Sequence, residues 1–196
     1  MESKENDNSK GSDDVLVIDA PYHGIEAKTF DVVLSDVTSG KLHGEVAMML
    51  GVEYLSVVPK EDVFELLHQK TFYGVKYGPY SRFMINLPCR LVSKRNHGTS
   101  PKQPLPFHNI IFLVHTGSPY TYLCQEAMET LLGENGGHAV PPMLNVELSS
   151  GLKLHFHLSP KSGHFADVNV LGGSAFFSSV GMISLANKTG FTLTFD

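Results

Sequence analysis

The stretch that most constrains this chain is residues 110–123, IIFLVHTGSPYTYL, in which two β-prone runs flank a short turn. Five apolar residues, Ile110–Val114, predict a buried strand. The turn that follows contains Gly117, and glycine readily accepts a sharp change of chain direction. Tyr120–Leu123 then predicts a strand that leaves in a new direction. Such a turn would hold the side chain of His115 rigidly at the end of a buried strand.

This turn resembles the catalytic loop of the retropepsin-like aspartic proteases, where apolar residues precede Asp, then Thr or Ser, Gly, and Ala or Ser. Thr116, Gly117 and Ser118 match that pattern, whereas His115 stands at the position of the catalytic Asp. A second stretch, Asp167–Gly172, resembles the apolar segment ending in glycine that closes the protease core. Asn169 follows His115 by 54 residues (169 − 115), a spacing that suits one retropepsin-like half.

The resemblance implies a mainly β fold, a retropepsin-like closed barrel that forms one half of an acid protease, over residues 79–196. It implies a short helix at Gly173–Val180 and a C-terminal strand, Phe191–Phe195, with which two protomers pair. It also implies the site residues. These are His115, Thr116, Gly117 and Ser118 at the catalytic position, and Leu171 and Gly172 beside the substrate.

Residues Leu144–Leu158 carry the clearest alternation of apolar and polar side chains in the chain, on both sides of Ser149–Gly151. Strict alternation around a glycine turn predicts a β-hairpin. The resemblance implies that this region supplies the flap over a substrate, with Ser149, Ser150 and Gly151 at its tip. The register also allows the hairpin to be the pair of strands that follows a short flap.

The first third of the chain carries no motif that we recognise. Residues 1–14 are polar and predict a disordered tail, and residues 15–78 predict a small β/α extension. Strands are expected at 15–18 and 30–34, and helices at 42–50 and 61–69. The Gly- and Tyr-rich stretch Tyr73–Tyr80 is interpreted as the linker into the second part.

Composition excludes several classes of function. A net charge of −5, with 15 scattered Lys and Arg residues, argues against a nucleic-acid surface. No apolar run approaches the roughly 18 residues of a membrane span, and we expect no membrane contact. The start of the chain does not resemble a secretory signal, which predicts a cytoplasmic location. Cys89 and Cys124 lack the spacing of a disulfide framework or a metal site and are predicted to be buried thiols.

Aspartic protease chemistry needs two carboxylates that share a proton around a water molecule. One retropepsin-like half supplies one of them and a second copy the other, so a homodimer of this chain would bring two His115 imidazoles together. Two imidazoles in contact disfavour each other's protonation and stay neutral. We therefore predict a catalytically impaired domain that acts as a peptide-binding or dimerisation module, with an extended peptide or protein as its ligand.

Several alternatives stay open. The chain is an active aspartic endopeptidase if its Asp has been substituted here, or if an Asp-bearing paralogue supplies one in a heterodimer. Asp167 is a second source of acid, although a surface carboxylate is the more frequent role. Zinc on His115, with His155 or His157, lacks further ligands, so we expect no metal and no cofactor. His155 and His157 are then solvated hairpin residues. The protease resemblance could also be accidental in a β-rich scaffold.

Overall fold

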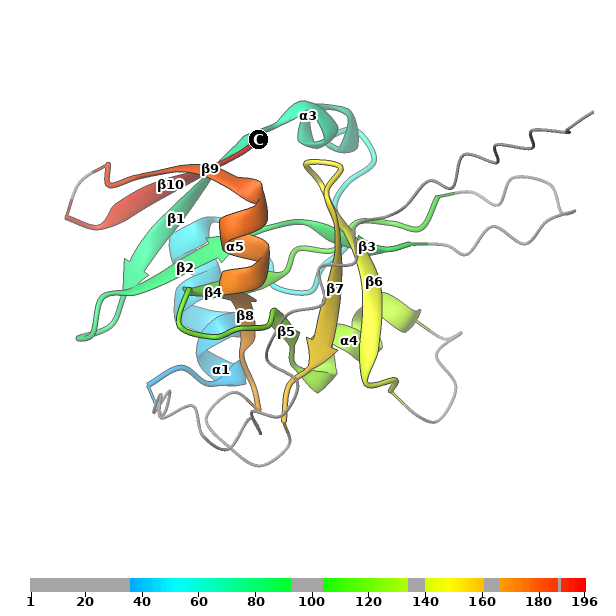
Figure 1. Ribbon diagram of the computed structural model, residues 1–196, viewed down its shortest axis with the longest axis horizontal. Coiled ribbons are helices and arrows are strands. Elements are labelled where there is room, and N and C mark those ends of the chain that lie inside the picture. Colours follow the sequence, from blue (N-terminus) through cyan, green and yellow to red (C-terminus); the bar gives the residue numbers. More distant parts are fainter. Residues whose placement is uncertain (1–35, 93–103, 134–139, 161–165, 187) are drawn as a thin grey trace, which may run out of the picture.

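The computed structural model describes residues 36–92, 104–133, 140–160, 166–186 and 188–196. Within these residues, ten strands join in one curled sheet with the order β3-β6-β7-β5-β8-β4-β2-β1-β10-β9 (Figure 1). The strands are β1 Thr71–Tyr77, β2 Arg82–Asn86, β3 Cys89–Leu91, β4 Ile111–His115, β5 Tyr122–Leu123, β6 Met143–Leu148, β7 Lys153–Leu158, β8 Asn169–Gly172, β9 Val180–Ser184 and β10 Gly190–Phe195. The predicted mainly β class is confirmed.

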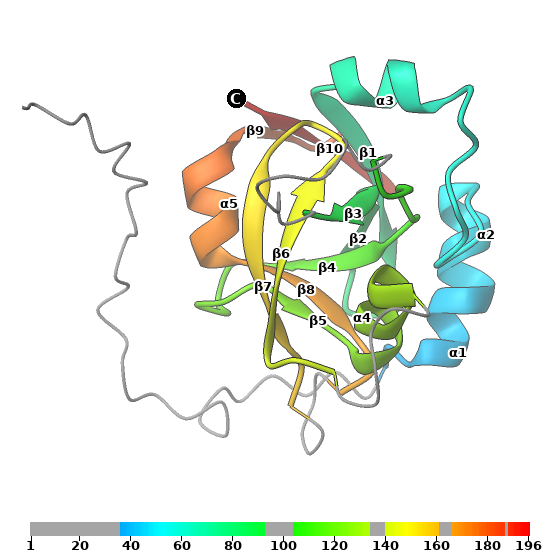
Figure 2. The same cartoon turned by 90° about the vertical axis from the view of Figure 1, so that its right-hand side faces the viewer.

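Short helices cover the flanks of this sheet. They are α1 Ser39–Lys41, η2 Leu42–Val46, α2 Ala47–Leu50, α3 Val63–His68, α4 Gln125–Leu132 and α5 Gly173–Ser179. The first three follow one another without a break on the flank opposite α5 (Figure 2). The helix predicted at 42–50 is confirmed but begins earlier, where the Thr38 side chain accepts the N–H of Lys41. Among the described residues, no helix is long and apolar enough to cross a bilayer.

Two apolar clusters pack against the sheet. The larger one includes Phe112 and Phe156, whose rings stack with their centroids 5.6 Å apart. The smaller one joins the helical segment before residue 56 to the strands, through residues such as Leu42, Leu113 and Val170. Alternate residues of β4 enter different clusters, as the pleat of a strand requires. The N-terminal segment is thus packed on the β domain through a shared core.

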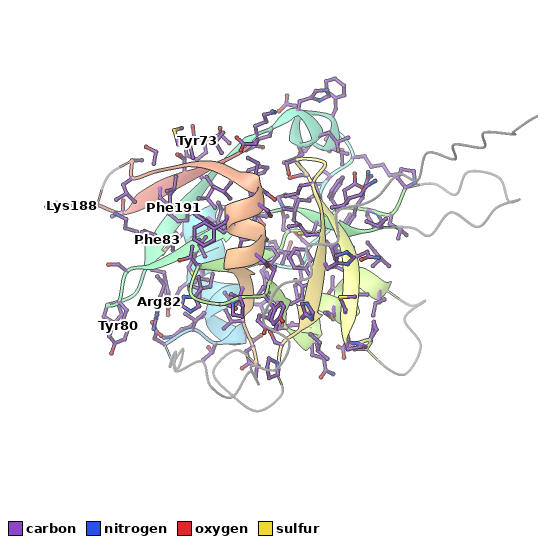
Figure 3. All side chains as sticks on the ribbon, in the orientation of Figure 1. Tyr73, Tyr80, Arg82, Phe83, Lys188 and Phe191 are labelled. Carbon is purple, nitrogen blue, oxygen red and sulfur yellow. The ribbon has the colours of Figure 1, made fainter. Side chains whose placement is uncertain are left out.

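The interpretation of Tyr73–Tyr80 as a linker is wrong. Most of this stretch belongs to β1, which pairs with both β2 and β10, so the sheet begins before residue 79. Gly74 serves packing here, because a Cβ at this position would lie 2.2 Å from the Phe191 ring. The glycine that suggested a flexible connection instead makes room for an aromatic side chain in the core. Figure 3 shows Phe191 beside Phe83 at this point, with ring centroids 4.9 Å apart.

The hairpin predicted around Ser149–Gly151 is confirmed, whereas the last strand of the chain is not placed as expected. β6 and β7 pair around the Ser149–Gly151 turn, and β9 pairs with β10. The strand Phe191–Phe195 was expected to pair two protomers, yet β10 lies inside the sheet with β1 and β9 on its two sides. The outer strand on this side of the sheet is β9, and β3 is the outer strand at the other end. The tail and the strands predicted at 15–18 and 30–34 lie outside the described residues.

Candidate functional site

Three short strands build the candidate site. β4 runs parallel to β8, with His115 paired to Gly172, and β5 runs antiparallel to β8 on its other side. Because β8 lies between β4 and β5, the loop that joins these two strands crosses the end of β8. Residues 110–118 and 167–172, which were selected separately from the sequence, therefore meet at one point. The loop lies at the base of α5 in Figure 1.

Gly172 lets this loop approach β8 closely. A Cβ at residue 172 would lie 1.9 Å from the carbonyl oxygen of Tyr120, so no other residue fits without a backbone shift. The Gly172 N–H donates to Thr121 Oγ1 at 3.1 Å, and the Gly173 N–H donates to the Ser118 carbonyl at 2.6 Å. Thr121 was not predicted as a site residue, since its β-prone position gave no sign of a polar role. These contacts fix the loop against the start of α5.

The His115 imidazole is half-buried at the end of β4 and lies over Gly117. A Cβ at residue 117 would lie 3.1 Å from Cε1 of the imidazole, so Gly117 leaves the space that the ring fills. Burial lowers the pKa of His115 below that of a free histidine, and the positive charge of Arg82 lowers it further. At neutral pH the group at the tip of this loop is therefore a neutral imidazole.

Arg82 carries the positive charge next to this loop. Its Nε and Nη2 atoms donate to the two carboxylate oxygens of Asp36, each at 3.1 Å, in a bidentate pair. The guanidinium also lies 5.3 Å from the centre of the Tyr80 ring, and Figure 3 shows both side chains at the turn between β1 and β2. The hydrogen bond from Arg82 lowers the pKa of Asp36. The carboxylate of Asp36 is thus ionised, and both of its oxygens accept hydrogen bonds from Arg82.

The remaining loop residues differ in burial. The Ser118 side chain is buried and donates to the Tyr120 carbonyl at 2.8 Å, which stabilises the turn from within. Thr116 and Gly117 are exposed at the tip. The assignment of Thr116 and Gly117 to the catalytic position stays a prediction.

Asn169 holds the strands of the site together below the loop. This fully buried side chain donates to the Tyr54 hydroxyl at 2.7 Å and to the Ile111 carbonyl at 2.9 Å. Its Oδ1 atom accepts the N–H of Cys124 at 2.9 Å. Burial raises the pKa of Tyr54, so its hydroxyl stays protonated. Asn169 was selected from the sequence for its position in a motif, and this network was not predicted.

The predicted flap tip lies elsewhere. Ser149 is fully buried, and its N–H donates to the Pro88 carbonyl at 2.8 Å. Figures 1 and 2 both show the tip of the β6–β7 hairpin at the end of the molecule near α3, away from the base of α5. The structure thus brings Leu171 and Gly172 to the His115 loop, but it does not bring Ser149–Gly151 there.

Other candidate side chains also lie apart from His115. Asp167 is exposed and precedes Gly172 by five residues, roughly 16 Å along an extended chain. It lines a cavity of about 270 Å³ together with Cys124 and Glu126, at the far end of β8. Both cysteines are buried and free, as predicted. In the part of the chain that the structure describes, no three His, Cys, Asp or Glu side chains form a group suited to a metal ion.

The two hairpin histidines are not equivalent. His155 is exposed, as expected, but the interpretation of His157 as a solvated residue is wrong. The His157 ring is half-buried, and its centroid lies 4.8 Å from that of Tyr120 and 6.1 Å from that of Tyr122. The curl of the sheet brings β5 against β7 and covers this side chain. Burial, followed by the charge of His155, lowers the pKa of His157.

Stability is expected to fall as the pH is lowered from 7 through about 6.5, the pKa of an unfolded histidine. His115 and His157 have lower pKa values in the folded chain, so the unfolded chain binds more protons there and stability is lost toward acid. Urea denaturation at several pH values measures this loss. It should be smaller in the His115→Gln/His157→Gln variant. An equal loss in that variant, with His155→Gln as the matched control, would refute the assignment.

Among solved structures, the crystal structure of a retropepsin-like aspartic protease from Rickettsia conorii is similar to this chain. The TM-score is 0.38 and the sequence identity 15%, over 64% of this chain and 92% of that one. No protein-family model matches the chain, and no curated protein matches it.

Proposed function

We propose that this chain is a retropepsin-like module without peptidase chemistry of its own, which pairs with a second copy and holds extended peptide segments. The observation that carries this proposal is the His115 imidazole at the end of β4, in register with Gly172 and at the start of the crossing loop. A loop of this shape suits a reacting group held at a fixed point. The group it holds is a neutral imidazole, which cannot share a proton in the way that two carboxylates do.

Neither Asp167 nor Asp36 replaces the missing acid. Asp167 lies at the opposite end of β8, and both carboxylate oxygens of Asp36 accept from Arg82. An ionised carboxylate held by a guanidinium is a poor proton donor, because its protonated form is disfavoured. We therefore expect no acid–base pair from a single chain or from two identical copies.

Self-pairing is supported by β9, one of the two outer strands of the sheet. β9 is at the end of the strand order, and residues 180–186, VGMISLA, contain no charge and no proline. Natural edge strands are usually protected by charged residues or proline. Because residues 180–186 contain neither, this apolar edge suits a partner strand. Met182, Ile183 and Leu185 expose 57%, 43% and 62% of their surface. A second copy suits this edge, since identical strands in a two-fold pair bring the same residues together and charged residues would repel.

The Met182→Lys substitution is expected to convert a dimer into a monomer. Antiparallel pairing of β9 with its own copy brings the two residues 182 close to each other, and two lysines there would repel and be desolvated. Light scattering after size exclusion measures the mass in solution. Met48→Lys is the matched control, because Met48 is 78% exposed on α2, far along the chain from β9. A native monomer, or an equal effect of both substitutions, would reject pairing through β9.

Peptide binding is tested separately with an unfolded, alkylated protein as the probe. We expect the probe to co-elute with the chain at neutral pH and to remain intact during the incubation. Peptide segments would bind in extended form, in which their backbone can hydrogen-bond to the protein as an added strand. Failure to co-elute, with the dimer intact, would remove peptide binding from the proposal and leave self-association.

A further inference from the structure

Arg82 and His115 are cross-strand neighbours. β2 and β4 are antiparallel, with Met84 paired to Leu113 and Ile85 to Phe112. Continuing this register by two residues places Arg82 opposite His115. Their side chains lie on one face of the sheet, because Met84 and Leu113 are each two residues away from them in the same strand and both pack in the smaller apolar cluster. Directly opposite residues of an antiparallel pair have Cβ atoms about 5 Å apart.

Arg82 is held in this place by the N-terminal segment. The ion pair with Asp36 is largely shielded from solvent, with 20% of the Arg82 side chain and 13% of the Asp36 side chain exposed. Lys41 supports Asp36 by donating to its carbonyl at 2.9 Å. On the other side of His115, β8 presents Gly172, which has no charge. Arg82 is therefore the charged group that faces residue 115 from the neighbouring strands. Asp36 partly offsets this positive charge through its ion pair with Arg82.

We propose that Arg82 is a positioning residue that sets the charge of residue 115, so that this loop carries no protonated acid with either histidine or aspartate at that position. A positive neighbour disfavours a protonated imidazole and favours an ionised carboxylate. Two features then oppose aspartic protease chemistry: the histidine at residue 115 on β4, and the positive charge of Arg82 on β2. This inference rests on the proposed function, in which the loop is a protease-like site without acid–base chemistry.

The effect on the native residue is measured by NMR titration of the histidine ring signals in the full chain, with His115 assigned from their loss in His115→Gln. In Arg82→Gln the His115 midpoint should move to higher pH, because the positive neighbour is gone. In Arg82→Lys, which keeps the charge, it should stay near the native midpoint. In Asp36→Asn it should move to lower pH, because Arg82 loses its counter-charge.

A second pair of variants tests the aspartate. In His115→Asp, burial raises the midpoint of the new carboxyl group and the positive charge of Arg82 lowers it. In His115→Asp/Arg82→Gln its midpoint should rise. If Arg82→Gln fails to fold, Arg82→Gln/Asp36→Asn replaces the ion pair with two amides. It is expected to show a smaller upward movement of the His115 midpoint, because the loss of the Asp36 charge acts in the opposite direction.

Equal His115 midpoints in the Gln and Lys variants of Arg82 would overturn the proposal, and so would an unchanged midpoint in Asp36→Asn. A general disturbance of the fold would not give different His115 midpoints in Arg82→Gln and Arg82→Lys. It would also not move the midpoint in opposite directions when Arg82 or Asp36 is replaced. The titrations need neither peptide nor dimer. Their failure is therefore distinct from a failure of the proposed function, which would appear in the mass and co-elution measurements.

Discussion

Replacing Gly172 by alanine is expected to lower the free energy of unfolding by about 3 kcal/mol. The new Cβ would lie 1.9 Å from the Tyr120 carbonyl oxygen and 2.4 Å from its carbon, and both are backbone atoms that cannot rotate away. The strand β8 or the loop that crosses it must move, which also disturbs the hydrogen bond from Gly172 to Thr121. Urea denaturation followed by circular dichroism measures the loss.

Gly44→Ala is the matched control for this substitution. Gly44 lies in η2, and a Cβ there would meet no atom within 4 Å. Alanine is favoured over glycine in a helix by up to about 1 kcal/mol, so this variant should be neutral or more stable. If Gly172→Ala were as stable as Gly44→Ala, the close approach of the loop to β8 would not exist as described.

Replacing Asn169 by leucine should also cost about 3 kcal/mol. The substitution keeps the size of the side chain but removes its hydrogen bonds to Tyr54, Ile111 and Cys124, all in the buried interior. Each buried polar group left without a partner costs about 1–3 kcal/mol, and relaxation of the Tyr54 hydroxyl recovers part of the sum. Thermal and urea denaturation both measure the effect.

Asn145→Leu provides the comparison, because Asn145 is exposed on β6 and the same chemical change there should stay within about 0.5 kcal/mol. The Asn169 variant should also show faster hydrogen exchange at the Cys124 amide, which loses its acceptor. Similar stability of the two leucine variants would mean that the Asn169 network does not hold β4 and β8 together.

The alternation of apolar and polar residues predicted the elements that depend only on neighbouring residues in the chain. The alternation around Ser149–Gly151 gives β6 and β7, as expected. The meeting of residues 110–118 with 167–172 was predicted through a family resemblance, because no local signal connects them. The interpretation of Tyr73–Tyr80 as a linker was wrong because Gly74 makes room for the ring of Phe191, which lies more than a hundred residues later in the chain.

The polar contacts of the site were beyond sequence reasoning for a similar reason. Arg82 and His115 become neighbours through the register of β2 and β4, which depends on strand pairing across an intervening segment. The hydrogen bond from Asn169 to Tyr54 forms only when the N-terminal segment packs on the sheet. The position of β10 inside the sheet also depends on pairing, and a C-terminal strand looks the same in sequence whether it is internal or at the edge.

The most direct measurement of the central claim, a protease-like loop without acid–base chemistry, is incubation of the native chain with a denatured protein across acidic and neutral pH, with products separated by mass spectrometry. We predict that the substrate stays intact at every pH. Cleavage by the chain itself, blocked by a peptide that mimics the tetrahedral transition state and lost in His115→Gln, would contradict this and identify an active endopeptidase.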